Sequence, residues 1–165
     1  MAIGEVQPST STILEALNRV MDPEIPVISI VEMGLIRHVS VRRDGVTVKM
    51  TPTFSGCPAL HVIKADIENC IRDMGIENVK VETVLDPPWT SDWISDLARA
   101  KLKQFGLAPP SRHGGRVELT FYDTVVCPYC DSQNTNIKND FGPTLCRANC
   151  YCNNCQQPFE QFKAL

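Results

Sequence analysis

Six of the chain's eight cysteines lie between Cys127 and Cys155, and four of these form two Cys-x-x-Cys pairs. Residues 117–165 are too few to build a sufficient apolar core, so this part of the chain needs a cross-link. Each Cys-x-x-Cys turn can supply two thiolates to a tetrahedral metal ion. The spacing therefore predicts a zinc ribbon over residues 117–165, with Cys127, Cys130, Cys152 and Cys155 as ligands.

The cysteines of the tail leave two matters open. Four thiolates hold either zinc or an iron–sulfur cluster, so spacing alone does not identify the metal. Cys146 and Cys150 exceed the four ligands of a tetrahedral site. They could be buried packing thiols, ligands that displace one of the four, or part of an iron–sulfur site.

Charge and hydropathy restrict the cellular setting. The net charge is −3, and residues 109–165 hold 5 Lys+Arg against 5 Asp+Glu, so neither nucleic acid nor a membrane surface is expected as a partner. No stretch approaches the roughly 20 apolar residues of a membrane span, and no signal-peptide pattern opens the chain. We expect a cytoplasmic protein, in which reduced, clustered thiols bind metal rather than form disulfides.

Residues 1–108 carry the patterns of a mixed domain. Ser9 to Ser11 offer several cap candidates for an amphipathic helix that reaches Met21. Alternation of apolar and polar residues on both sides of Asp44-Gly45 predicts a β-hairpin with one solvated face. A second helix starts at Pro58, a third strand covers residues 79–85, and another helix is capped by Thr90 or Ser91 and ends at Gly106.

Ala108-Pro-Pro-Ser-Arg-His-Gly-Gly115 has the composition of a linker, stiff at its prolines and loose at its glycines. We therefore predict a domain over residues 1–108, a linker over 109–116 and the ribbon over 117–165. His113 in this linker is expected to be solvated.

Cys57 is the candidate reactive residue of the first domain. It belongs to Thr51-Pro-Thr-Phe-Ser-Gly-Cys-Pro-Ala59, where Pro58 suits the first turn of a helix. A cysteine beside a helix N-terminus favours the thiolate, which binds metals and reacts. The alternative is a small, buried, apolar cysteine at a strand-to-helix turn.

Two further pairs of residues have open roles. Asp22 and Glu24, which flank Pro23, could form a rigid acidic site or be ordinary loop carboxylates. Trp89 and Trp93 could present a partner-binding surface or cover the core beneath a loop.

Several motifs resemble a known family. Asp22-Pro-Glu-Ile-Pro26, Glu32-Met-Gly-Leu35 and the Thr51–Ala59 stretch resemble the domain family shared by MIP18 proteins and bacterial iron–sulfur assembly factors. Pro88-Trp-Thr-Ser-Asp-Trp93, Gly106-Leu-Ala-Pro-Pro110 and the tail from Phe141 to Lys163 resemble one branch, the D-type subunits of bacterial phenylacetyl-CoA epoxidase.

The resemblance implies an α+β domain, in which helices pack on one face of a small three-stranded sheet, followed by a zinc ribbon. It implies a maturation factor for an oxygenase with a di-iron site and a reductase with flavin and a [2Fe–2S] cluster. Cys57 would be a transient iron–sulfur ligand, with Asp22, Glu24 and Cys146 as auxiliary candidates. Cys150 departs from the family pattern, where an apolar or aromatic residue is expected.

The functional expectation is a non-catalytic accessory component of the epoxidase in aerobic phenylacetate catabolism. Its partners would be the oxygenase and reductase components, and a homodimer is compatible with the sequence. The alternatives are a structural subunit that bridges those components, or a thiol-dependent enzyme that uses Cys57. No phosphate-binding loop, Ser/His/Asp pattern or Glu-x-x-His pair in the sequence favours an enzyme.

Overall fold

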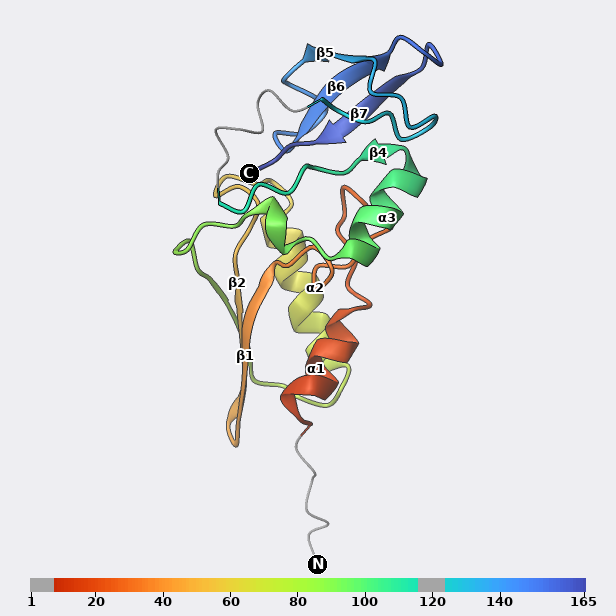
Figure 1. Ribbon diagram of the computed structural model, residues 1–165. Coiled ribbons are helices and arrows are strands. Elements are labelled where there is room, and N and C mark those ends of the chain that lie inside the picture. The colour runs from red at the N-terminus through yellow and green to blue at the C-terminus, as the bar shows by residue number, and fades with distance from the viewer. Residues whose placement is uncertain (1–7, 116–123) are drawn as a thin grey trace, which may run out of the picture. The chain divides into compact units, whose positions relative to one another are not determined.

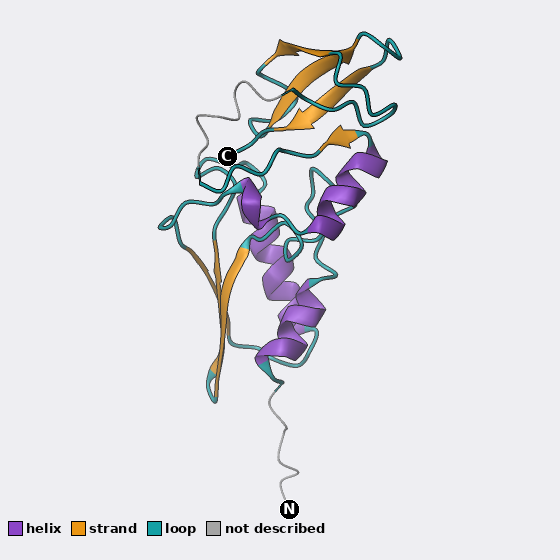
Figure 2. Ribbon diagram, in the orientation of Figure 1, coloured by secondary structure: helices purple, strands orange, loops and turns teal. Residues whose placement is uncertain are grey.

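The computed structural model describes residues 8–115 and 124–165, which form two compact units. The first unit holds the described residues up to Pro52 together with Pro58–Pro87. The second holds Thr53–Cys57 together with the described residues from Pro88 to Leu165. Residues 88–108, which the sequence prediction assigned to the first domain, thus pack with the cysteine-rich tail. Each unit has its own sheet (Figure 2).

A three-stranded sheet in the order β1-β2-β3 forms the base of the first unit. β1 (Ile36–Arg42) and β2 (Gly45–Met50) form the predicted hairpin, and β3 (Val79–Thr83) runs parallel to β2. Alternate residues of β2 are buried because successive side chains of a strand point to opposite faces. The buried ones are Val46, Val48 and Met50.

Two helices, α1 (Thr10–Leu17) and α2 (Leu60–Arg72), cover one face of this sheet (Figure 1). The predicted α+β class, with helices on one face of a three-stranded sheet, is confirmed. α2 turns its isoleucines inward. α1 is capped by Ser9, one of the predicted candidates, whose side chain accepts a hydrogen bond from the Thr12 amide at 3.2 Å.

The end of α1 differs from the prediction. The helix stops at Leu17 instead of continuing to Met21. The next residues turn back along the chain: the Val20 carbonyl accepts from the Ile30 amide at 3.0 Å, and Met21 forms an isolated bridge with Ser29. This long-range pairing satisfies backbone groups that a longer helix would have paired locally.

In the second unit, the predicted helix from Thr90 is split in two. Thr90 caps a single 3₁₀ turn, η1 (Ser91–Trp93), and α3 (Asp96–Phe105) has its own cap in Ser95. The Ser95 hydroxyl accepts from the Ala98 amide at 3.1 Å. Gly106 ends α3 as predicted, with a left-handed φ of 88°.

The ribbon sheet of the second unit has the order β4-β7-β6-β5. β6 lies antiparallel to both β5 and β7, whereas β4 runs parallel to β7. The strands are β4 (Leu107–Ala108), β5 (Thr135–Asn139), β6 (Arg147–Cys152) and β7 (Pro158–Phe162).

Trp89 packs into this unit and is only 5% exposed. Its ring centroid lies 5.9 Å from that of Phe162, at the end of β7. Trp89 therefore belongs to the core rather than to a partner-binding surface. Trp93 is half-buried.

The predicted linker is held in place where the structure describes it. Arg99 of α3 donates to the Pro110 carbonyl, and Arg112 pairs with Asp96. The side chain of His113 is 1% exposed, so the expectation of a solvated histidine is wrong. Its contacts are described with the site below.

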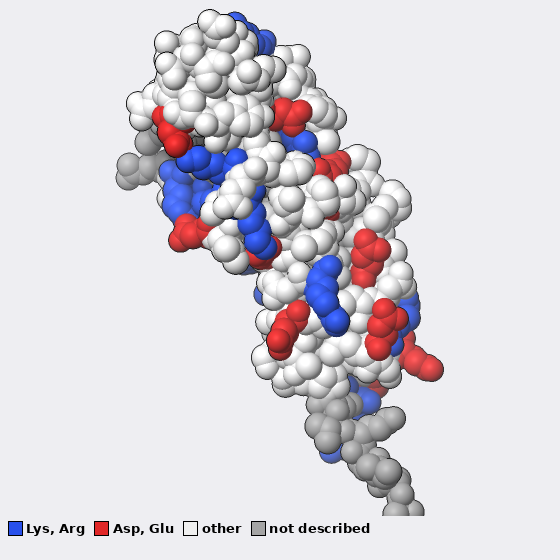
Figure 3. All heavy atoms as spheres, turned by 90° about the vertical axis from the view of Figure 1, so that its right-hand side faces the viewer, with Lys and Arg blue, Asp and Glu red and all other residues white. Residues whose placement is uncertain are grey.

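Within the described ranges, no helix is both long and apolar enough to cross a membrane. On the face shown in Figure 3, Lys and Arg side chains lie beside Asp and Glu side chains.

Candidate metal centre and the Gly-Cys-Pro turn

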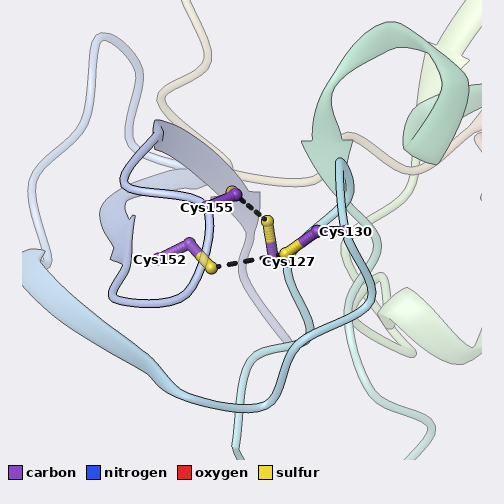
Figure 4. Close-up of side chains that lie close together, drawn as sticks. All are labelled: Cys127, Cys130, Cys152 and Cys155. Atoms are coloured by element: carbon purple, nitrogen blue, oxygen red, sulfur yellow. Dashed lines mark hydrogen bonds between the residues drawn. The ribbon is translucent and has the colours of Figure 1, made fainter.

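Four cysteines converge in the ribbon. Cys127 and Cys130 come from the turn before β5, Cys152 ends β6, and Cys155 lies in the turn that leads to β7. All four sulfur atoms lie within 4.8 Å of one another (Figure 4). The Sγ atoms of Cys127 and Cys155 are 3.7 Å apart, and those of Cys130 and Cys152 are 3.6 Å apart.

The backbones of the two Cys-x-x-Cys turns match each other. Asp131 and Gln156, which each follow the second cysteine of a pair, both have a left-handed φ of 59°. The Cys127 amide donates to the Ser132 carbonyl at 3.0 Å, and in the same way the Cys152 amide donates to the Gln157 carbonyl at 3.0 Å. The left-handed residue turns the chain back so that both sulfurs of a pair point inward.

Hydrogen bonds and burial shift the pKa values of three of these thiols, and not all in the same direction. The side-chain amide of Asn154, 3.6 Å from the sulfur, is the main cause that lowers the pKa of Cys130 to about 6. Burial and the neighbouring sulfurs raise the pKa of Cys155 to about 12, and burial raises that of Cys127. Four thiolates this close repel one another, so a cation is needed to keep all four ionised.

The geometry fits zinc. Four sulfurs at about 2.3 Å from a tetrahedral Zn²⁺ would be about 3.8 Å from each other. The two sulfur–sulfur distances of 3.7 and 3.6 Å are close to this value. Asn154 and the left-handed residues Asp131 and Gln156 support the ligands; the sequence analysis did not single them out, although each lies within or directly after a cysteine pair.

The two remaining cysteines of the tail lie outside this group of four. Cys150 is 3% exposed and packs in the ribbon core beside Cys127, Cys152 and Phe159. Burial raises its pKa to about 11, so it is a protonated packing thiol. Cys146 is buried, with its sulfur 3.1 Å from the Thr144 hydroxyl.

Cys57 lies in a turn between β2 and α2. Its amide donates to the Phe54 carbonyl at 3.1 Å, and the residue is half-buried. α2 begins at Leu60 rather than at Pro58, so the predicted helix start is wrong by two residues. Cys57 thus lies three residues before the first residue of α2 and outside its first turn, where the helix dipole mainly acts.

Asp22 shapes the loop that follows α1. It is 7% exposed, and its Oδ1 accepts from the amides of Glu24 at 2.8 Å and Ile25 at 2.9 Å. A carboxylate that closes a turn in this way is a structural group of the loop. Glu24 is half-buried.

The same loop contains a reciprocal cap between Ser29 and Glu32. The Glu32 carboxylate accepts from the Ser29 amide at 3.0 Å, and the Ser29 hydroxyl accepts from the Glu32 amide at 3.1 Å. This Ser-x-x-Glu pair has the pattern of a capping box. These two bonds give Glu32, the first residue of the Glu32-Met-Gly-Leu35 motif, a structural role within its own loop.

His113 connects η1 to the last residue of the chain. The Gly115 amide donates to its Nδ1 at 3.1 Å, so the ring proton is on Nε2. Nε2 lies 3.0 Å from the Leu165 carbonyl oxygen and 3.1 Å from the Thr90 hydroxyl. The Asp92 carboxylate accepts from the His113 amide at 3.0 Å. This cluster is structural, because the protonated Nε2 cannot act as a base toward Thr90.

Two family profiles match the chain. Residues 10–85 match the iron–sulfur cluster assembly protein family, and residues 113–163 match the PaaD zinc beta ribbon domain. A crystal structure of a DUF59 domain from Bacillus anthracis superposes with a TM-score of 0.52 and 27% identity, over 56% of this chain and 89% of that one. A conserved hypothetical protein from Thermotoga maritima superposes with a TM-score of 0.52 and 33% identity, over 62% of this chain and 98% of that one.

Relatives extend the match to nearly the whole chain. A protein of Escherichia coli K12, provisionally named as the D-type subunit of 1,2-phenylacetyl-CoA epoxidase, is 37% identical over 158 residues, which cover 96% of this chain and 94% of the relative. An Fe-S protein maturation auxiliary factor of Porphyromonas gingivalis is 39% identical over 101 residues, which cover 60% of this chain and 95% of that protein. The chain therefore belongs to the family of phenylacetyl-CoA epoxidase D-type subunits, in which an iron–sulfur cluster assembly domain is followed by a PaaD zinc ribbon.

Proposed function

We propose that this protein is a non-catalytic maturation factor of a multicomponent phenylacetyl-CoA 1,2-epoxidase and that it assists assembly of an iron–sulfur or di-iron centre in that enzyme. One observation carries the proposal: an iron–sulfur assembly domain and a PaaD ribbon occur in a single chain that aligns with a D-type epoxidase subunit over 96% of its length. Relatives of the first domain alone are named as Fe-S maturation factors.

In this proposal the two kinds of cysteine have different tasks. Cys127, Cys130, Cys152 and Cys155 hold a structural zinc ion that stabilises the ribbon. Cys57 is a transient ligand of the iron–sulfur cargo, because its half-buried thiol lies in a turn outside any helix or strand and is not required for the zinc site.

The three auxiliary candidates, Asp22, Glu24 and Cys146, also have different roles in this proposal. Asp22 positions the loop, since its carboxylate already accepts two backbone hydrogen bonds. Glu24 stays the acidic candidate for contact with the cargo. Cys146, next to the Thr144 hydroxyl, supports the ribbon rather than the cargo.

Co-expression of the oxygenase and reductase components with Cys57→Ala tests the proposal. We expect reductase with less iron and sulfide per polypeptide and a lower epoxidase activity than with wild type. Cys70→Ala is the matched control, because it removes the other cysteine outside the tail, whose thiol bonds to the Ala16 carbonyl. Full cluster loading with Cys57→Ala would refute the role of this cysteine.

The alternative, a structural subunit that bridges oxygenase and reductase, makes the opposite prediction. Such a subunit would co-purify stoichiometrically with the catalytic components, and Cys57→Ala would be harmless while loss of the ribbon would not. Burial of Trp89 removes one side chain from the surface that this alternative would use.

A further inference from the structure

The loop that joins β5 to β6 (Figure 1) displays two large apolar side chains to solvent. Phe141 is 73% exposed and Leu145 is 54% exposed. Exposed apolar residues are ordinary when they occur singly. Here two occur on one short loop of a small module, which is typical of an interaction surface.

Hydrogen bonds from two of its backbone amides, one to a side chain and one to a carbonyl, hold this loop in one conformation. The Phe141 amide donates to Asn139 Oδ1 at 3.0 Å, and the Gly142 amide donates to the Arg147 carbonyl at 3.0 Å. A Cβ on Gly142 would come within 2.9 Å of that carbonyl oxygen, so the close approach requires glycine. A loop that is already ordered loses little conformational entropy when a partner binds.

Positive charge lies beside the apolar groups. The ammonium of Lys163 is 5.6 Å from the centroid of the Phe141 ring, and among the described residues it forms no ion pair. Lys138 and Asp140 are exposed nearby in the chain, so the two lysines and one aspartate carry a net charge of +1. We define Phe141, Leu145 and Lys163 as the hairpin-tip patch.

We propose that the hairpin-tip patch docks onto an acidic protein surface of the epoxidase component whose metal centre this protein matures. An apolar side chain of the partner would pack on Phe141 and Leu145, and a carboxylate beside it would pair with Lys163. The proposal rests on the proposed function, because it takes its partner from there. Nucleic acid stacked on Phe141 and a second copy of this chain are the competing occupants.

The test uses the full-length, zinc-loaded protein and purified oxygenase and reductase components, each immobilised in turn. We expect Phe141→Ser/Leu145→Ser to weaken binding to one component by tenfold or more, about the effect of losing a hot-spot anchor. Lys163→Glu should weaken the same binding several-fold and reduce its dependence on salt. Leu97→Ser is the matched control, since Leu97 is 62% exposed on α3, and it should bind like wild type.

The outcomes separate this proposal from the proposed function. If wild type binds a component and the double variant, with unchanged zinc content and melting temperature, binds equally well, the patch is not the docking surface. If wild type binds neither component and does not change their metal content, the proposed function itself fails. Binding only to single-stranded oligonucleotides, or a concentration-dependent dimer that the double variant abolishes, would overturn the proposal in favour of a competing occupant.

Discussion

Asp131 and Gln156 occupy equivalent positions, each directly after the second cysteine of a pair, and both have a φ of 59°. This conformation costs a residue with a Cβ roughly 1–2 kcal/mol relative to glycine. The ribbon keeps it at two positions because the left-handed turn brings both sulfurs of each pair to the metal. The backbone after the cysteines is thus as much a part of the site as the thiols.

The first prediction concerns Gln156. Gln156→Gly should raise the free energy of unfolding of the zinc-loaded protein by about 1 kcal/mol because it removes the steric cost of the left-handed φ. Gln156→Val should lower it, since a β-branched residue fits that conformation worst. Gln157→Gly is the control: Gln157 has no positive φ, so glycine there should not raise the free energy of unfolding that a denaturant titration measures.

Removal of the metal should unfold the ribbon. The zinc-bound tail buries too little apolar surface to stay folded alone, and four sulfurs without a cation repel when ionised. We expect one zinc and no stoichiometric iron per chain by elemental analysis. A strong chelator should then broaden the NMR signals of residues 124–162 while those of β1, β2 and α2 persist. A chelated ribbon with unchanged chemical shifts would contradict the structural role of zinc.

His113 should contribute strongly to stability despite its place in a glycine-rich segment. Its ring bonds to the Leu165 carbonyl and to the Gly115 amide, and it is almost fully buried. Loss of buried hydrogen bonds of this kind costs about 1–3 kcal/mol. We expect His113→Ala to lower the free energy of unfolding by that amount in urea titration, whereas His61→Ala, at an exposed position of α2, should leave it unchanged.

Asp92 should make stability depend on acid pH. Burial raises its pKa, but hydrogen bonds from the backbone amides of His113, Gly114 and Gly115 outweigh this effect, so the pKa in the folded state is lowered. A carboxyl with a lowered pKa stabilises the fold above its unfolded pKa of about 3.9. That contribution is lost as the pH falls through the folded pKa.

The measurement compares wild type with Asp92→Asn by urea unfolding from pH 6 down to pH 2.5. The difference between their free energies of unfolding should be constant at the upper end of this pH range and shrink below about pH 4. Taking the difference removes acid effects that both proteins share, such as protonation of the zinc ligands. A difference that stays constant over the whole range would show that Asp92 has an ordinary pKa.

Substitutions of Asp22 distinguish a turn-closing carboxylate from a functional charge. Asp22→Asn keeps a side-chain oxygen that can accept from the Glu24 and Ile25 amides, so its stability and its support of cluster loading should stay near wild type. Asp22→Ala loses both hydrogen bonds and should be destabilised by about 1–2 kcal/mol. A fully stable Asp22→Asn that fails to support cluster loading would show that the charge itself is needed.

The features with short-range causes could be predicted from the sequence. The Asp44-Gly45 hairpin, the Ser9 cap and the stop at Gly106 each depend on a few neighbouring residues. The convergence of Cys127, Cys130, Cys152 and Cys155 could also be predicted, because each turn presents two of them by its own local geometry. The role of Cys150 could not be predicted in this way, since no local pattern around a cysteine outside the two Cys-x-x-Cys pairs shows whether its thiol faces the metal site or the core.

The sequence by itself thus determined the fold class, the family and which four cysteines converge in the ribbon. Only the tertiary structure decided that α1 stops at Leu17, that the Asp22 carboxylate closes a turn, and that His113 is buried. The last case shows the physical reason: the ring is fixed by hydrogen bonds to Thr90 and Leu165, which lie 23 and 52 residues away in the chain. No local pattern around His113 records partners that only folding brings within hydrogen-bonding distance.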